Sequence, residues 1–375
     1  MNNIKYIKNN NAKKVKSQVL VFSQKREKAR GQEKIITRIA PSPTGNLHLG
    51  TARAALFNYL FAKKYGGEFI LRIEDTDLER SDKKYEQDII DGLKWLSIKW
   101  DIGPFRQSER LDIYEKYIKK LLASGKAFWC YHTKEELEKE KKEQTAKNES
   151  PKHICGHKIK SQKSRIQSQS QKGIIRLNTS AKIVKFNDLI RGEISFDSSL
   201  LGDISLAKDE RIPLYNLAVI IDDYEMKISH VIRGEDHISN TPKQILIQEA
   251  LGFESPHYAH LPLILGSDKS KLSKRHGATS VNDYLKQGYS PKAMVNFLAL
   301  LGWAPNDNRE IFTLKELSKE FLLERVQKGG AVFNIEKLNW LNGCYIRKTS
   351  VKKLTELCAP YLKIQNSKPQ FKNQN

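Results

Sequence analysis

Residues 35–73 constrain the fold of this chain most strongly, because they predict a strand, a helix and a second strand within one short span. The segment 35–40 is mainly apolar, 48–65 carries apolar residues near a 3.6-residue period, and 69–73 is again mainly apolar. Gly66-Gly67 ends the helix. A strand–helix–strand unit of this length predicts two parallel strands joined by a right-handed crossover. Such sheets bind their ligands at the carboxyl ends of the strands.

The turn inside this unit has the composition of a phosphate-binding site. Residues 38–50 read Arg-Ile-Ala-Pro-Ser-Pro-Thr-Gly-Asn-Leu-His-Leu-Gly and lead directly into the helix. Backbone N–H groups and the helix dipole at such a helix start favour a polyanion. The turn lacks the Gly-Lys-Ser/Thr of a P-loop and the G-x-G-x-x-G spacing of a dinucleotide site, and offers His48 two residues before Gly50 instead. Glu74 and Asp77 follow the second strand, so we expect them at the same edge of the sheet, in one site.

The stretch 127–185 differs in character from the unit before it. Helices are expected at 81–97 and 110–124, after which only short apolar pieces appear. A Lys/Glu-rich helix at 134–147 and a Ser/Gln/Lys-rich tract at 160–172 offer little to a core. This composition predicts an inserted domain rather than a continuation of the sheet.

The alternation of helices and strands resumes after the insertion. Residues 215–221 predict either a helix or a buried strand, 228–232 predict a strand and 237–251 a helix. One sheet would therefore join residues 34–107 with residues 215–262. Further helices are expected beyond the glycine- and lysine-rich loop that follows, at 290–302, 313–323 and 334–342.

The charge balance favours a polyanionic partner, above all nucleic acid. The formal net charge is +22, and +14 remains when residues 1–34 are set aside. Those 34 residues predict either a disordered basic extension or a mitochondrial or plastid import peptide, with a cytoplasmic protein as the alternative to import. No apolar run approaches the roughly 18 residues of a membrane helix. Four cysteines in so long a chain favour a reducing compartment.

Several short motifs follow one another in an order that is more specific than any one of them alone. In chain order they are Arg38, Ser42, His48 and Gly50; Arg72-Ile-Glu-Asp-Thr-Asp77; Tyr215; Val231-Ile-Arg-Gly-Glu-Asp-His237; and Lys271-Leu-Ser-Lys-Arg275. With these residues the sequence resembles a class I aminoacyl-tRNA synthetase, specifically a bacterial or organellar glutamyl-tRNA synthetase. His48-Leu-Gly-Thr51 resembles the H-I-G-H element of that family, and Lys271-Leu-Ser-Lys-Arg275 resembles its K-M-S-K-S loop. The resemblance covers roughly residues 34–350.

The resemblance implies a ligase that uses ATP and Mg²⁺ to activate L-glutamate and then charges tRNA. A carboxylate that attacks the α-phosphate needs no enzyme nucleophile, only stabilisation of charge on the phosphate and on the leaving group. His48 can donate to the α-phosphate, and Lys271 and Lys274 on a mobile loop can neutralise pyrophosphate, although most lysine runs are solvated surface. The implied ATP-binding residues are Thr44, Gly45, His48, Gly50, Lys271, Ser273 and Lys274.

Glutamate brings two carboxylates and an ammonium group, so its pocket should contain arginines and a carboxylate. By resemblance the amino acid is bound by Arg38, Ser42, Glu74, Tyr215 and Arg233. The competing interpretation is a set of structural ion pairs at strand ends, and Tyr215 could belong to the core. An arginine facing the substrate side chain would favour glutamate over glutamine.

The insertion holds a candidate metal site. Cys130-Tyr-His132 and Cys155-Gly-His157 supply two thiols and two imidazoles, a ligand set that suits tetrahedral Zn²⁺. Many related synthetases hold zinc in the acceptor-stem domain through C-x-C and a later C-x-H or C-x-Y, and here His132 stands where the second cysteine would be. Free buried cysteines and surface histidines are the alternative.

These features predict an α/β fold with a Rossmann-like parallel-sheet catalytic domain, split by an inserted acceptor-binding α+β domain and followed by a mainly helical domain. The expected ranges are 1–34 for the basic extension, 35–107 and 215–262 for the catalytic domain, 108–214 for the insertion, 263–350 for a stem-contact domain and 351–375 for a tail. We expect a monomer. The family continues into an anticodon-binding region, so the chain is expected to be truncated, split or independent of the anticodon.

Two other functions stay open at this stage. A shortened paralogue would transfer glutamate to a modified base of tRNA, but the segments 324–334 and 338–343 resemble the full synthetase. A catalytically silent tRNA-binding protein would tend to lose His48 or Lys274, and both are present. Glutaminyl-tRNA synthetases are less similar in the first motif.

Overall fold

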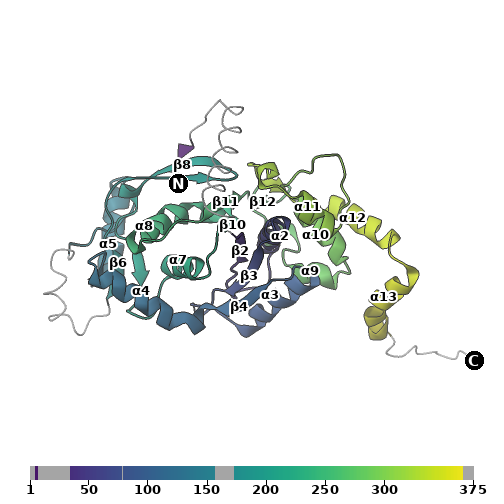
Figure 1. Ribbon diagram of the computed structural model, residues 1–375, viewed down its shortest axis with the longest axis horizontal. Helices are drawn as coiled ribbons and strands as arrows, with labels where there is room; N and C mark the ends of the chain where they lie inside the picture. Colours follow the sequence, from purple (N-terminus) through teal and green to yellow (C-terminus); the bar gives the residue numbers. More distant parts are fainter. Residues whose placement is uncertain (1–4, 7–33, 78, 157–172, 366–375) are drawn as a thin grey trace, which may run out of the picture.

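The computed structural model describes residues 5–6, 34–77, 79–156 and 173–365. Its centre is an eight-stranded sheet in the order β1-β8-β7-β11-β10-β2-β3-β4 (Figure 1). The strands are β1 (Lys5–Tyr6), β2 (Ile36–Ile39), β3 (Glu68–Ile73), β4 (Ile102–Arg106), β7 (Ile183–Asp188), β8 (Gly192–Asp197), β10 (His230–Gly234) and β11 (His257–Leu261). All pairs from β7 to β4 are parallel, while β8 is antiparallel to both β7 and β1.

The predicted junction of two distant chain segments is confirmed, because β10 pairs with β2 through His230 and Thr37. Alternate residues of the strands enter two different core clusters. Ile70 packs with one cluster and its neighbours Phe69 and Leu71 with the other, since successive strand side chains point to opposite faces. The sheet therefore has a packed layer on each face.

The helix of the opening unit is α2 (Leu49–Lys64), which packs on β2 and β10. Its four alanines are strong helix formers and are all buried, so the sheet and neighbouring helices approach closely. The same core cluster holds α10 (Pro291–Leu300) and α11 (Leu314–Glu320). The helical region after residue 263 thus shares its core with the catalytic sheet, and Figure 1 shows these helices beside α2.

The opposite face is covered by α4 (Leu111–Ala123), α7 (Tyr215–Glu225) and α8 (Thr241–Leu251). Residues 215–221, left open between helix and strand, belong to helix α7. The helix expected from residue 237 begins later, because a 3-10 turn, η4 (Glu235–Asn240), precedes α8. Pro242 in the first turn of α8 suits a helix start.

The expectation that the insertion stands apart from the sheet is wrong for residues 183–197. Strands β7 and β8 lie within the range 108–214 but extend the main sheet through the pair Asp188–Tyr258. The rest of the insertion forms a separate three-stranded antiparallel sheet of β5 (Ala127–Cys130), β6 (Ile174–Leu177) and β9 (Ser205–Ala207), with α5 (Lys134–Ala146). Periodicity along a strand does not reveal which sheet the strand joins, since its partner lies about 70 residues away in β11.

The other helices, 3-10 turns and strands complete the described structure. They are α3 (Lys83–Trp95), η1 (Gln107–Arg110), η3 (Ser198–Leu200), β12 (Ile264–Leu265), η5 (Lys274–His276), α9 (Val281–Lys286), η6 (Leu323–Arg325), β13 (Ala331–Val332), α12 (Ile335–Arg347) and α13 (Val351–Gln365). Most of the predicted basic extension, the tract 160–172 and the end of the predicted tail lie outside the described residues. Among the described residues, no helix combines the length and the apolar character needed to cross a membrane.

Candidate active site

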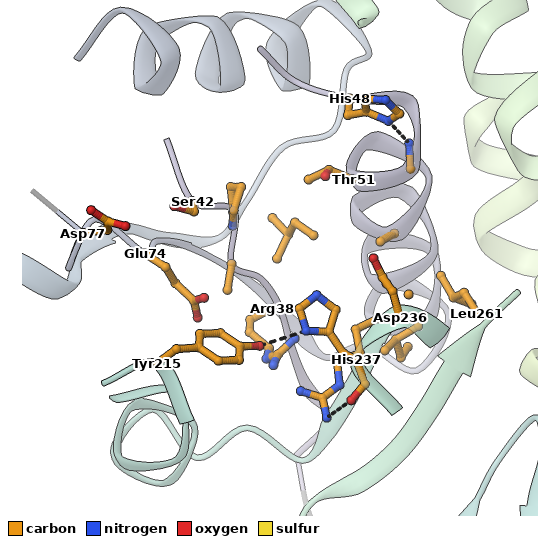
Figure 2. Close-up of a pocket in the computed structure, with 18 of the residues that line it drawn as sticks. Arg38, Ser42, His48, Thr51, Glu74, Asp77, Tyr215, Asp236, His237 and Leu261 are labelled. Atoms are coloured by element: carbon orange, nitrogen blue, oxygen red, sulfur yellow. Dashed lines mark hydrogen bonds between the residues drawn. The ribbon is translucent and has the colours of Figure 1, made fainter. Parts of the chain in front are cut away.

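A cavity of about 1020 Å³ lies at the carboxyl ends of β2, β3 and β10. Figure 2 shows His48 at the start of α2 on one side of it, and Arg38, Glu74 and Tyr215 on the other. The predicted site residues in its wall are Arg38, Ser42, His48, Gly50, Glu74, Tyr215, Arg233 and Lys271. The edge of the sheet therefore brings together residues that are more than 200 positions apart in the chain.

His48 is the N-cap of α2, and its ring nitrogen Nδ1 accepts a hydrogen bond from the backbone N–H of Gly50 at 3.4 Å. Partial burial and the positive charge of Lys271 lower the pKa of the His48 imidazole. A neutral ring whose Nδ1 accepts carries its proton on Nε2. His48 is thus prepared to donate from Nε2 to an anion beside the positive end of the helix.

The loop between β12 and α9, residues 266–280, carries Lys271 and is joined by backbone hydrogen bonds to the residues on either side of His48. Leu49 donates its N–H to the carbonyl of Thr279 at 3.0 Å, and Val281 donates to the carbonyl of Leu47 at 2.9 Å. Lys271 lies in the cavity wall with an exposed side chain, and its Nζ pairs with Asp236 at 3.2 Å. One end of the loop is therefore anchored beside the imidazole while Lys271 is accessible to a ligand.

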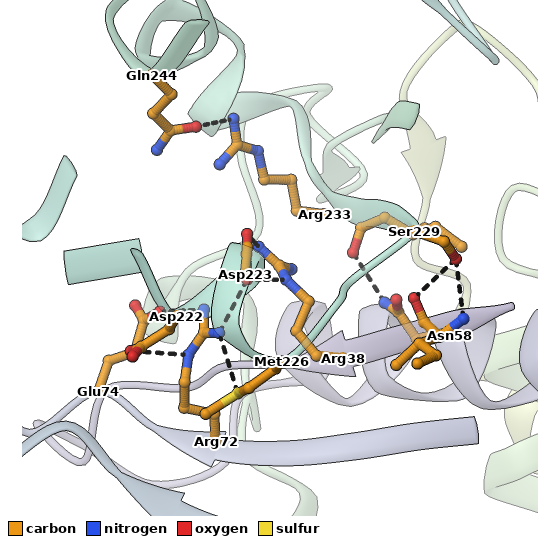
Figure 3. Close-up of polar contacts among 12 residues, drawn as sticks. Arg38, Asn58, Arg72, Glu74, Asp222, Asp223, Met226, Ser229, Arg233 and Gln244 are labelled. Carbon is orange, nitrogen blue, oxygen red and sulfur yellow. Dashed lines mark hydrogen bonds and ion pairs between the residues drawn. The ribbon is translucent and has the colours of Figure 1, made fainter. Parts of the chain in front are cut away.

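Arg38 is buried at 4% exposure and donates from Nε and Nη2 to the two carboxylate oxygens of Asp223, at 3.1 and 3.2 Å. The same carboxylate accepts from Nη1 of Arg72 at 2.8 Å, and Arg72 also donates to Glu74 at 3.1 Å (Figure 3). Burial raises the pKa of Asp223, but the two arginines outweigh it and hold the pKa below its ordinary value. For Glu74 burial prevails and raises the pKa. The network fixes Arg38 and leaves its Nη1 without a partner among the described residues.

Arg233 is held differently, because all of its protein acceptors are neutral. Its Nη2 donates to Thr241 and to Gln244, each at 2.8 Å, and its Nε donates to His260 at 3.1 Å. Figure 3 shows the contact with Gln244. Among the described residues Arg233 forms no ion pair, and burial lowers its pKa. A buried guanidinium without a counter-charge in a cavity wall favours an anionic ligand.

A second cluster lies in the insertion, where Cys130, His132, His153 and Cys155 bring their ligand atoms within 4.8 Å of one another. The thiol Sγ of Cys130 lies 3.4 Å from both His132 Nδ1 and His153 Nε2. Burial raises the pKa of Cys130, but its hydrogen bonds with His153 and His132 outweigh burial and lower the pKa to about 5. Two thiol and two imidazole donors at these separations fit a tetrahedral Zn²⁺.

Comparison with known proteins decides the family. The catalytic domain of the class I tRNA synthetases (E and Q) matches residues 34–340. This chain belongs to that family. The glutamate–tRNA ligase of Carboxydothermus hydrogenoformans is 52% identical over 335 residues, which cover 86% of this chain and 70% of the relative. The glutamate–tRNA ligase of Desulforamulus reducens is 50% identical over 339 residues, covering 88% of this chain and 70% of the relative.

A solved structure also supports the assignment of this chain to the synthetase family. The crystal structure of a glutamate tRNA ligase from Elizabethkingia meningosepticum in complex with its amino acid superposes with a TM-score of 0.82 at 36% identity. The match covers 90% of this chain and 75% of that one. The predicted class I fold, with its Rossmann-like parallel sheet, is thereby confirmed.

Some of the predicted site residues do not line the cavity or lie outside the described residues. Thr44, Gly45 and Ser273 are not among the residues that line the cavity. Ser273 instead contacts His276, with its backbone N–H donating to Nδ1 at 3.0 Å. Lys274 begins η5, and its side chain lies outside the described residues, as does all of His157.

Sequence reasoning missed Asp223, His237 and His153. Two consecutive acids in the apolar run 215–225 were a usable signal for Asp223, because a charge in a buried helix needs a partner. His237 lines the cavity and lies 3.1 Å from the hydroxyl of Tyr215 (Figure 2). His153-Ile-Cys155 repeats in reverse the spacing of Cys130-Tyr-His132, and this symmetry could have identified His153.

Proposed function

We propose that this synthetase is a glutamate–tRNA ligase. In the first step the α-carboxylate of glutamate attacks the α-phosphorus of ATP, forming glutamyl-adenylate and releasing pyrophosphate. In the second step the terminal ribose hydroxyl of tRNA attacks the acyl carbon, forming glutamyl-tRNA and releasing AMP. The observation that carries the proposal is that two buried arginines, Arg38 and Arg233, line the same cavity as His48 and Lys271.

The two sides of the cavity suit the two substrates. On the nucleotide side, His48 donates from Nε2 to the α-phosphate, and Lys271 neutralises charge on the departing phosphates, where Mg²⁺ bound with ATP would supply further positive charge. On the amino-acid side, Arg38 is already paired with Asp223, whereas Arg233 has no ion pair among the described residues. We assign Arg233 to the side-chain carboxylate of glutamate and Glu74, with Ser42 and Tyr215, to the ammonium end.

The remaining assignments rest on composition and topology. We propose that the insertion contacts the acceptor stem of tRNA, that residues 263–350 contact the stem nearby, and that the enzyme acts as a monomer. Zn²⁺ would be held by Cys130, His132, His153 and Cys155 and would stabilise the insertion by linking the end of β5 to residues 153–155. The relatives named above are bacterial, and they give no support to organellar import.

Pyrophosphate exchange into ATP with glutamate, with and without tRNA, tests the proposal, followed by acid-gel analysis of the charged tRNA. Glutamate-dependent exchange and an alkali-labile ester on the tRNA terminus are expected. Exchange without tRNA and attachment to an internal base would indicate the paralogue instead. Absence of exchange under both conditions, with binding of tRNA retained, would indicate a silent tRNA-binding protein.

A further inference from the structure

Arg233 is the last member of a buried chain of three side chains on adjacent parallel strands. Its Nε donates to Nε2 of His260 at 3.1 Å, and Nδ1 of His260 lies 2.6 Å from Oδ2 of Asp188. Arg233 is on β10, His260 on β11 and Asp188 on β7. His260 and Asp188 are 0% and 1% exposed and do not line the cavity, so they reach a ligand only through Arg233.

The donors around His260 determine its protonation and its tautomer. An arginine cannot accept a hydrogen bond, so Nε2 of His260 must be the acceptor from Arg233. The proton of the neutral ring is then on Nδ1, where it is donated to Asp188. Thr241 supports this arrangement, because its hydroxyl lies 3.1 Å from Nε2 and accepts from Nη2 of Arg233 at 2.8 Å.

Asp188 can serve this arrangement only as a carboxylate. Its oxygens accept from the backbone N–H groups of Ile190, Arg191 and His260 at 2.8 to 3.0 Å, besides the ring of His260. All four groups are donors. An amide in this place would direct its own N–H₂ at donors, or would force the proton of His260 onto Nε2, against Arg233.

The choice of a neutral acceptor has a consequence for binding. A carboxylate in place of His260 would hold Arg233 as firmly but would neutralise its charge, as Asp223 does for Arg38. His260, Thr241 and Gln244 accept hydrogen bonds from Nε and Nη2 and so fix the orientation of the guanidinium. Because these acceptors are neutral, the positive charge of Arg233 is available to a ligand. Its Nη1 has no partner in the part of the chain that the structure describes.

We propose that His260 and Asp188 are positioning residues that orient Arg233 toward the side-chain carboxylate of the substrate without neutralising it, and so set the preference for glutamate over glutamine. The inference rests on the proposed function, since it takes glutamate as the ligand of Arg233. It assigns a role in substrate selection to two residues that do not touch the substrate.

A matched pair of variants separates this role from a merely structural one. In His260→Gln the side-chain oxygen can take the place of Nε2 and still accept from Arg233, whereas in His260→Asn the shorter side chain can reach only toward Asp188. The assay is pyrophosphate exchange with tRNA at varied glutamate, varied glutamine and varied ATP. Circular dichroism melting of each variant reports its folding.

We expect His260→Asn to raise KM for glutamate about tenfold or more, the size of one hydrogen bond to a charged group, and to lower the glutamate-over-glutamine ratio by a similar factor. KM for ATP should stay near the wild-type value, and His260→Gln should restore most of the loss. Asp188→Asn, which removes the carboxylate that fixes the tautomer of His260, should resemble His260→Asn.

Equal KM values for glutamate in His260→Asn and His260→Gln, or equal changes for glutamate and ATP, would overturn the inference while the proposed function stands. A wild-type enzyme without glutamate-dependent exchange would overturn the proposed function, and the inference with it. If His260→Asn does not fold, the comparison of Asp188→Asn with wild type decides: an unchanged KM for glutamate contradicts the inference.

Discussion

Asp223 accepts hydrogen bonds from Nε and Nη2 of Arg38, at 3.1 and 3.2 Å. Asp223 lies on a helix that covers one face of the sheet, and Arg38 lies on a strand within the sheet. The contact links α7, which follows the insertion, to β2, which precedes it. Asp223 also accepts from Arg72, which pairs with Glu74 and Asp222 as well, so two buried cations share three carboxylates. The substrate pocket and the stability of the fold therefore depend on the same ion cluster.

Replacing Asp223 by asparagine should destabilise the protein by about 3–5 kcal/mol at neutral pH, since it leaves Arg38 and Arg72 buried without their common counter-charge. The pKa of Asp223 lies below its ordinary value of 3.8, so its stabilising contribution is complete above pH 3.8 and disappears as pH falls through the folded-state value. The gap in unfolding free energy between wild type and Asp223→Asn should therefore shrink below pH 3.8. Denaturant titrations from neutral pH to pH 3 measure it.

The control for this effect is Asp112→Asn, because the Asp112 side chain is 85% exposed and pairs only at the surface with Arg211. It should change the unfolding free energy by less than about 1 kcal/mol at any pH. A gap for Asp223→Asn that stays constant down to pH 3 would contradict the assigned role of the charge.

His48→Ala should reduce turnover by about 10²-fold or more, because it removes one preorganised donor to the α-phosphate. His48→Gln, whose amide can place an N–H₂ near the position of Nε2, should retain more activity than His48→Ala. Single-turnover measurement of adenylate formation isolates the step. The exposed His257, at the start of β11, supplies a control, and His257→Ala should leave the rate unchanged. If His48→Ala formed the adenylate at the wild-type rate, the assignment of His48 as a donor to the α-phosphate would be contradicted.

Arg233→Gln should raise KM for glutamate by about 10- to 100-fold, with a much smaller effect on KM for ATP, because the ion pair with the side-chain carboxylate is lost. Its preference for glutamate over glutamine should fall in parallel. Arg309→Gln is the matched control, since Arg309 pairs with Asp307 and Glu320 on the surface of the helical region. Loss of ATP affinity equal to the loss of glutamate affinity would place Arg233 outside the amino-acid pocket.

Purified protein should contain about one zinc per chain, and Cys130→Ser or Cys155→Ser should abolish it. His153→Ala should lower zinc content and His157→Ala should not, because His153 completes the cluster of four. Elemental analysis of the purified wild-type protein and of each variant measures the zinc content per chain. The opposite result would assign the fourth ligand to His157, as the sequence alone suggested.

Glu140 contacts His153, one of the four proposed zinc ligands, and should therefore affect zinc binding as well. Its carboxylate lies 2.5 Å from Nδ1 of His153, which directs Nε2 of that ring toward the thiols. Glu140→Gln should weaken zinc affinity by about 10- to 100-fold in a competition with a chromophoric chelator. An unchanged affinity would show that His153 needs no such support.

Much of the site was predictable because its residues stand at the ends of elements. Arg38 is the penultimate residue of β2, Glu74 directly follows β3 and His48 is the N-cap of α2, so the rule that ligands bind at the carboxyl edge placed them together. The supporting residues were not predictable in the same way. Asp223 lies within a helix, and Asp188 and His260 lie on strands whose order in the sheet no local pattern reveals.

The sequence by itself determined the local elements, the helix start with its imidazole and the order of the motifs that indicated the family. Each of these depends on residues close together in the chain, through backbone geometry and side-chain periodicity. Only the tertiary structure decided that β7 and β8 join the catalytic sheet, that His153 lies with the cysteines, and that Arg38 is paired with a carboxylate while Arg233 is held by neutral acceptors. Those facts depend on which distant segments pack against one another, and the charge state and tautomer of a buried group follow from that packing.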